Sequence, residues 1–147
     1  MNSKTTQDSM QDIPEYGVPI SLVLAKKIMD SAEAEAEKNG WSVIIAIVDS
    51  GGHLVMLHKL DQAQYGSISV AQLKAETAVN FRRPTKAFEE AVAAGGLGMR
   101  ILTISNLLAV DGGLPILVDG KVIGAIGVAG MHPTQDAQVA KAGVDAV

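Results

Sequence analysis

The sequence of 147 residues contains no cysteine, and only 3% of its residues are aromatic. Disulfides, thiolate metal sites and cysteine nucleophiles are therefore excluded. With so few large rings, a core must be built from aliphatic side chains and alanine. The 15 glycines favour a close approach between neighbouring elements.

Long runs of one kind of residue are also missing. The net charge is −4 and the longest basic run is Arg82-Arg83, which argues against the clustered positive charge of a nucleic-acid surface. The longest apolar runs are too short to span a bilayer, and the first ten residues lack the apolar segment of a signal peptide. We therefore expect a cytoplasmic protein that contacts neither nucleic acid nor membrane.

Length and turn-forming residues predict one domain with a short tail. The chain is close to the commonest domain size. Residues 1–18 are polar and contain Pro14 and Gly17, which is typical of a mobile terminus. We expect residues 19–147 to form the folded domain.

Hydrophobic periodicity predicts an α+β fold. The expected elements are helices at 22–38, 67–80, 86–94 and 135–147 and strands at 41–48, 53–59, 114–118 and 121–129, while 97–110 could be a strand or a helical turn followed by a strand. Ser21, Thr85 and Thr134 are the expected N-caps of the first, third and last helices. Tight turns at 49–52 and 119–120 make the pairing antiparallel, and an antiparallel sheet with helices on its faces is the natural result.

Two segments indicate unusually close packing. Helix 67–80 carries Ala71, Lys74, Ala75, Ala78 and Val79 at helical spacing, and its alanine content predicts contact with a flat surface. Strand 121–129 and the residue after it alternate glycine or alanine with β-branched residues. Glycine weakens a strand unless something approaches closely, so Gly127 and Gly130 face either a packed helix, a ligand or a neighbouring subunit.

The histidines and one aspartate are candidates for ligand binding or catalysis. His53 and His58 are five residues apart in one strand and point to opposite faces, so they cannot chelate one metal together. Haem iron needs only one imidazole, which His53 or His132 could supply. His53 and Asp136 are the candidate acid–base groups, although Asp136 also suits the first turn of a helix.

Arg82 and Arg83 stand where the second helix ends, ahead of Pro84 and Thr85. Such a pair could hold a carboxylate or phosphate, and the helix N-terminus at Thr85 would add positive potential. The alternative is that both arginines solvate a helix end.

Five sequence blocks in order resemble the GlcG/HbpS-like family, the haem-degrading domain family, which also includes the C-terminal domain of PduO-type corrinoid adenosyltransferases. The blocks are VDSGGHLV at 48–55, FRRPT at 81–85, GGLPI at 112–116, IGAIGVAG at 123–130 and QDAQVAKAG at 135–143. The resemblance implies a profilin-like fold, with a five-stranded antiparallel sheet between helices in an α/β/α arrangement. It also implies homo-oligomers, often octamers.

The chain departs from the family pattern in its first helix. Haem-binding relatives are expected to carry the axial histidine near the start of that helix, and residues 18–40 contain no histidine. The helix also lacks an ExxE iron-binding pattern, because its glutamates are spaced by two.

Three functions remain open from the sequence. The first is a small-molecule-binding accessory protein of a catabolic pathway, in which Arg82 or Arg83 holds an organic acid, His53 adds a polar contact and residues 124–130 form the floor. The second is a haem- or tetrapyrrole-binding protein, with or without haem degradation. The third is an enzyme acting on a small organic acid, with His53 or Asp136 as acid–base group.

Overall fold

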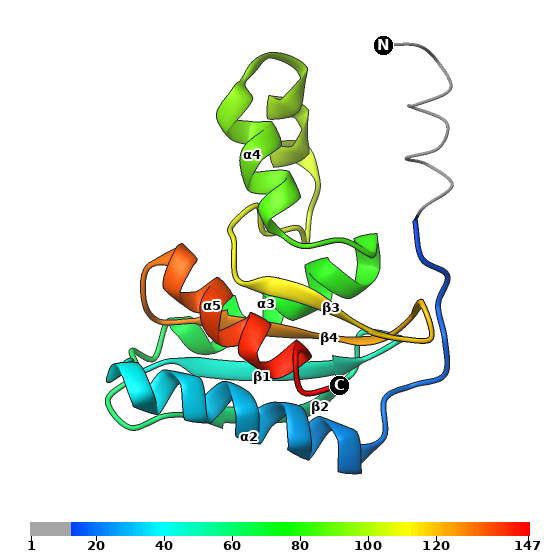
Figure 1. The fold of residues 1–147 in the computed structure, drawn as a ribbon. Coiled ribbons are helices and arrows are strands. Elements are labelled where there is room, and N and C mark those ends of the chain that lie inside the picture. Colours follow the sequence, from blue (N-terminus) through cyan, green and yellow to red (C-terminus); the bar gives the residue numbers. More distant parts are fainter. Residues whose placement is uncertain (1–12) are drawn as a thin grey trace.

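The computed structural model describes residues 13–147 (Figure 1). Its helices are α2 (Leu22–Asn39), α3 (Ser67–Phe81), α4 (Lys86–Ala94) and α5 (Pro133–Val144), with a 3₁₀ helix η1 (Gly96–Thr103). Its strands are β1 (Ile44–Asp49), β2 (Leu54–Lys59), β3 (Gly113–Val118) and β4 (Lys121–Ala129). Within this range no helix has both the length and the apolar character needed to cross a membrane.

The strands form one antiparallel sheet in the order β2-β1-β4-β3, as the tight turns predict. Helix α3 covers one face, while α2 and α5 lie side by side on the other (Figure 1). Central strand β1 is buried on both sides: Ile45 and Ile47 pack toward α2 and α5, whereas Ala46 and Val48 pack toward α3. This explains why β1 is a continuous apolar run without alternation.

The sheet has four strands, so the expectation of five is wrong. The expected extra strand within 97–110 is instead the 3₁₀ helix η1 and an irregular segment that returns to β3. Gly95 and Gly96 have positive φ angles of 75° and 59°, which turn the chain back along α4. A Cβ atom on Gly98 would lie 2.0 Å from the carbonyl oxygen of Ala91, so only glycine allows this contact.

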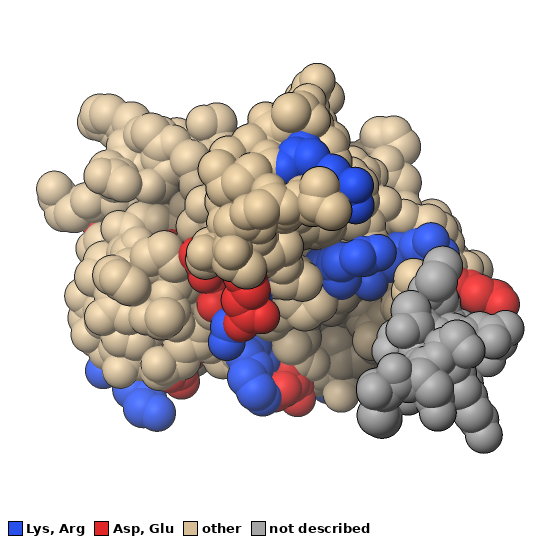
Figure 2. All heavy atoms as spheres, turned by 90° about the horizontal axis from the view of Figure 1, so that it is seen from above, with Lys and Arg blue, Asp and Glu red and all other residues tan. Residues whose placement is uncertain are grey.

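Helices α4 and η1 together form an arm that projects from the sheet and the other helices (Figure 1). The side chains of Leu97 and Leu102 on η1 are largely exposed. On the face drawn in Figure 2, lysine and arginine side chains form small separate groups between large uncharged areas. This face therefore lacks the continuous positive surface that binds a nucleic-acid backbone.

The N-cap residue predicted for the first helix agrees with the structure, whereas the one predicted for the last helix does not. The Ser21 hydroxyl accepts a hydrogen bond from the Leu24 N–H at 3.2 Å, which confirms that cap. Helix α5 begins at Pro133 with His132 as N-cap, so the expected cap at Thr134 is wrong. Proline is favoured in the first turn of a helix because its missing N–H would have no helical partner there.

Residues 1–12 of the expected mobile tail lie outside the described residues. Its described end lies against β4, where Val122 donates to the Glu15 carbonyl and Gly17 donates to the Val122 carbonyl, both at 2.8 Å. The Tyr16 hydroxyl donates to the Val79 carbonyl at 2.7 Å. Residues 15–17 are thus tied to both the sheet and the end of α3.

Candidate functional site

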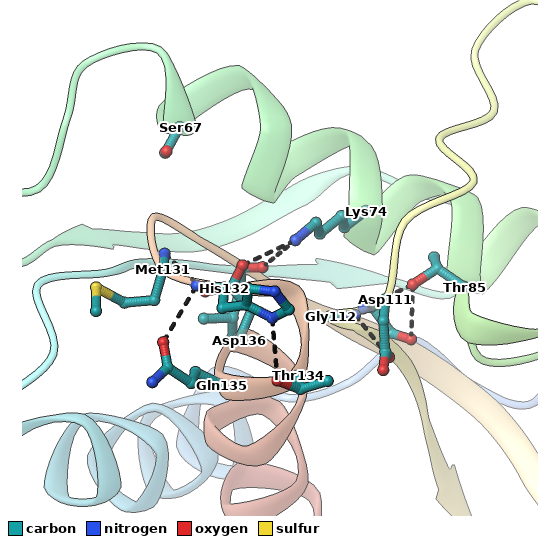
Figure 3. Close-up of polar contacts among 12 residues, drawn as sticks. Ser67, Lys74, Thr85, Asp111, Gly112, Met131, His132, Thr134, Gln135 and Asp136 are labelled. Carbon is teal, nitrogen blue, oxygen red and sulfur yellow. Dashed lines mark hydrogen bonds and ion pairs between the residues drawn. The ribbon is translucent and has the colours of Figure 1, made fainter. Parts of the chain in front are cut away.

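A buried ion pair joins the middle of α3 to the first turn of α5 (Figure 3). The Nζ atom of Lys74 lies 3.1 Å from the Oδ2 atom of Asp136, and both side chains are only 2% exposed. Lys74 also donates to the Val128 carbonyl at 2.9 Å. The Asp136 Oδ1 atom accepts the N–H of Met131 at 3.0 Å. Both charged groups are therefore paired and hydrogen-bonded, as buried charges must be.

Glycines bring the two partners close enough to pair. A Cβ atom at Gly127 of β4 would lie 2.1 Å from the Ala71 carbonyl oxygen, so α3 rests directly on the strand at this point. A Cβ atom at Gly112 would lie 2.8 Å from the Lys74 Nζ atom. The glycine at position 112 thus leaves the space that the ammonium group occupies.

The Asp136 carboxyl has a shifted protonation equilibrium. Burial raises its pKa above the usual value, and the lowering effects of the Lys74 ammonium and the Met131 N–H do not fully offset this. A buried carboxyl with a raised pKa beside an ammonium group can exchange a proton with it more readily than a solvated aspartate can.

The pair lies in the wall of a pocket of about 440 Å³. Its polar lining comes from Gln64, Ser67, Lys74 and Asp136, and its apolar lining from Val70, Val110, Ala129, Met131 and Pro133, with Gly66 and Gly130 completing it. The Gln64 amide donates to the Ser67 hydroxyl at 2.9 Å. Apolar walls with a few convergent polar groups are typical of small-molecule sites.

The other side of the pair is closed by the segment that enters β3 (Figure 3). Thr85 Oγ1 accepts the Gly113 N–H and Asp111 Oδ1 accepts the Gly112 N–H, both at 2.9 Å. Burial raises the pKa of Asp111, and the nearby Glu89 carboxylate raises it further. The hydrogen bond from the Gly112 N–H lowers this pKa by less, so the net shift is upward. Thr85 is the N-cap residue of α4, as expected, but its side chain makes no capping hydrogen bond.

The structure separates the predicted site residues. Asp136 and Gly130 line the pocket, whereas Gly127 lies beneath α3. His132 is exposed between the pocket residues Met131 and Pro133, and its Nδ1 atom lies 3.1 Å from Thr134 Oγ1.

His53 lies in the turn between β1 and β2, where it contacts Asp49 instead of the pocket. Its Nδ1 atom is 3.2 Å from Asp49 Oδ1, which also accepts the N–H groups of Gly51 and His53. Burial raises the pKa of Asp49, but these N–H bonds and the imidazole lower it by more, so the net shift is downward. This ordering of the turn accounts for the Asp-Ser-Gly-Gly-His sequence.

The two arginines have separate partners. Arg82 donates to the Pro14 carbonyl at 3.3 Å and its guanidinium lies 5.1 Å from the Tyr16 ring centre. Arg83 donates to the Phe81 carbonyl at 3.0 Å and lies 5.6 Å from the Phe88 ring centre. Neither arginine belongs to the lining of the pocket that holds Lys74 and Asp136.

Sequence reasoning missed Lys74, Gln64 and Ser67 as site residues. A signal for Lys74 was present, because it occupies the alanine-rich stripe of α3 and a lysine there needs a buried partner. Its partner is 62 residues away, so the sequence could not reveal the pair.

Comparison with known proteins places this fold in a family. A family model described as haem degrading protein HbpS-like matches residues 20–145. The chain belongs to the HbpS-like family. Protein GlcG of Escherichia coli K12 is 44% identical over 111 residues, which cover 76% of this chain and 81% of GlcG.

Several solved structures have the same fold as this chain. A double mutant of HbpS from Streptomyces reticuli is 31% identical, with a TM-score of 0.81 and coverage of 89% of this chain and 88% of HbpS. A complex of PduOC with haem matches at a TM-score of 0.80 over 88% of this chain and 96% of PduOC. At 24% identity, this structural match shows a shared fold.

The HbpS-like description implies haem, and one side chain at the pocket suits it. His132 has its Nδ1 atom engaged by Thr134, and metal-bound histidines are commonly oriented through the second ring nitrogen in this way. Residues 13–147 contain no group of three or more His, Cys, Asp or Glu side chains that could hold a metal ion by themselves. Haem iron needs only one protein imidazole, and His132 is the histidine that adjoins the pocket residues in the chain.

Proposed function

We propose that this protein binds a small polar organic molecule in the pocket beside Lys74 and Asp136. The observation that carries the proposal is a buried ammonium group in the pocket wall. An ammonium has three N–H donors, and Val128 and Asp136 accept two of them. The third donor is the anchor for a carbonyl or carboxylate oxygen of the ligand.

The remaining lining supports the same ligand chemistry. The Ser67 hydroxyl accepts from Gln64 and keeps its own proton to donate. Val70, Val110 and Met131 offer an apolar surface for a short carbon skeleton. A small oxo or hydroxy acid matches this combination of polar donors and apolar surface, in keeping with an accessory role in a catabolic pathway. Hydrogen bonds in such a site are stronger than in water because the local dielectric is low.

The predicted arginine clamp is a separate proposal for the same class of ligand. Arg82 and Arg83 would bind a carboxylate near the end of α3, outside the pocket. Their contacts with Pro14, Tyr16 and Phe88 hold them apart, so the pocket is the better supported site.

Thermal unfolding with a panel of short hydroxy, oxo and simple carboxylic acids tests both sites. A ligand at 100 times its dissociation constant should add about 2.7 kcal/mol to the free energy of unfolding. In a protein of this size, that raises Tm by roughly 5–10 °C. We expect Ser67→Ala to reduce the shift and Arg83→Ala, the matched control, to leave it unchanged.

The reverse pattern would assign the ligand to the arginines. If no acid in the panel raises the Tm of the wild-type protein, small-acid binding at either site is wrong.

The second candidate function is haem binding, which the family description and His132 favour. Haem would supply a redox-active iron, His132 would hold that iron and the apolar pocket wall would contact the ring. Titration with hemin should shift the Soret band, and His132→Ala should abolish the shift while His53→Ala preserves it. A spectrum unchanged in both variants would show that neither histidine is the axial ligand.

A further inference from the structure

The geometry points to Lys74 as an imine-forming lysine: we propose that its Nζ atom condenses with the carbonyl carbon of a small aldehyde or ketone in the pocket. The inference rests on the proposed function, because the reactant must first enter that pocket. It goes further by naming a covalent step and restricting the substrate class to carbonyl compounds.

Lys74 differs from the other described lysines in its surroundings. Within residues 13–147 it is the only buried lysine, whereas Lys38 and Lys141, for example, are exposed. Its Nζ atom is bounded by Asp136, the Val128 carbonyl and the backbone at Gly112. Lys74 also belongs to the lining of the pocket, so a molecule bound there lies next to this side chain.

Asp136 supplies the proton transfers that an imine needs. An ammonium group is not nucleophilic, so Lys74 must first give a proton to the Asp136 carboxylate 3.1 Å away. Burial of Asp136, which raises its pKa, favours that transfer. Ser67, two helical turns before Lys74 on the same face of α3, lines the same pocket and can bind a part of the reactant away from its reacting carbonyl.

The step balances in atoms and charge. The Nζ lone pair forms the C–N bond as the C=O π pair moves to oxygen, giving a carbinolamine after proton transfer. Asp136 then protonates the departing hydroxyl, the C–O bond breaks and water leaves. The net reaction converts a lysine ammonium and a carbonyl compound into a protonated imine and one water molecule, without oxidant or reductant.

Charge conservation explains why this buried site tolerates the product. The protonated imine keeps the single positive charge of Lys74, so Asp136 has an ion-pair partner both before and after the reaction. Buried ion pairs often stabilise a fold no better than packed apolar side chains. A chemical role therefore accounts for an ion pair placed in a pocket wall better than stability alone does.

Reductive trapping tests the proposal on the intact wild-type protein. Pyruvate or propanal is added with cyanoborohydride, which reduces imines to stable amines, and the labelled lysines are located by peptide mass spectrometry. We expect labelling of Lys74 to be at least about tenfold faster than that of exposed Lys38 because bound reactants have a high effective concentration. Lactate, which has the acid but no ketone, should label neither lysine.

Labelling of Lys74 at or below the rate of Lys38 would overturn the imine. If lactate and pyruvate still raise Tm in that case, the pocket proposal stands; if neither does, both proposals fall together. Asp136→Asn provides a second test: it should slow labelling of Lys74 but not of Lys38. Equal labelling of Lys74 in this variant and in the wild-type protein would remove Asp136 from the reaction.

Discussion

Replacing Lys74 with methionine is expected to lower the free energy of unfolding by about 3–5 kcal/mol. The substitution has nearly the same volume, but it leaves the Asp136 carboxylate buried at 2% exposure without its cation. An uncompensated buried charge costs far more than the ion pair itself contributes. Urea unfolding of both proteins at neutral pH measures the difference.

The loss should depend on pH in a defined direction. The pKa of Asp136 is already raised in the folded protein, so its ionisation opposes folding, and stability falls as pH rises from the unfolded to the folded value. Without Lys74 the folded pKa rises further. The deficit of Lys74→Met should therefore shrink as the pH is lowered from neutrality and Asp136 takes up a proton.

A double variant tests whether the loss of stability comes from the unpaired charge of Asp136 or from altered packing. Lys74→Met combined with Asp136→Leu removes both charges, and we expect it to recover most of the lost stability. A single variant as stable as the wild-type protein at neutral pH would contradict the burial of the pair. So would a deficit that does not change with pH.

Gly127→Ala is expected to destabilise the protein by about 3 kcal/mol, the upper part of the range for overpacked cores. The added methyl group would lie 2.1 Å from the Ala71 carbonyl oxygen and 2.5 Å from the Ala75 nitrogen. Both are backbone atoms of α3, so a side-chain rotation cannot relieve the clash. The helix would have to move away from β4, and the Lys74–Asp136 contact would lengthen.

Gly66→Ala is the matched control for this prediction. No atom lies within 4 Å of a Cβ built there, and Gly66 has a φ of −59°, which any residue adopts. We expect its effect to stay within about 1 kcal/mol. Thermal unfolding of the two variants compares them directly, and equal stabilities would show that α3 does not rest on Gly127 as described.

Local signals in the sequence predicted most of the fold. Asp119 and Gly120 have φ angles of 52° and 75°, as a tight hairpin turn requires, and β4 has the bounds expected from its pattern. The stretch 97–110 could not be predicted, because its path depends on contact between Gly98 and the Ala91 carbonyl. That contact is tertiary, while the apolar residues of the segment suit a strand equally well.

The candidate site was predicted in part, for a related reason. Asp136 and Gly130 were identified because a first-turn carboxylate and a glycine after a strand are visible locally. The role of Lys74 could not be predicted from its place in the helix, because it depends on the residue that packs against it in the folded chain. Arg82, Arg83 and His53 suggested a site through residue type and a place beside a helix end or a turn, and the structure gives each of them a different neighbour.

The sheet separates two apolar cores, one beneath α3 and one beneath α2 and α5. The Lys74–Asp136 pair joins a residue of the first helical layer to a residue of the second, at the end of β4. The pair therefore links the two helical layers directly, in addition to the sheet that lies between them. Any molecule that binds Lys74 therefore contacts a residue that is tied to both helical layers.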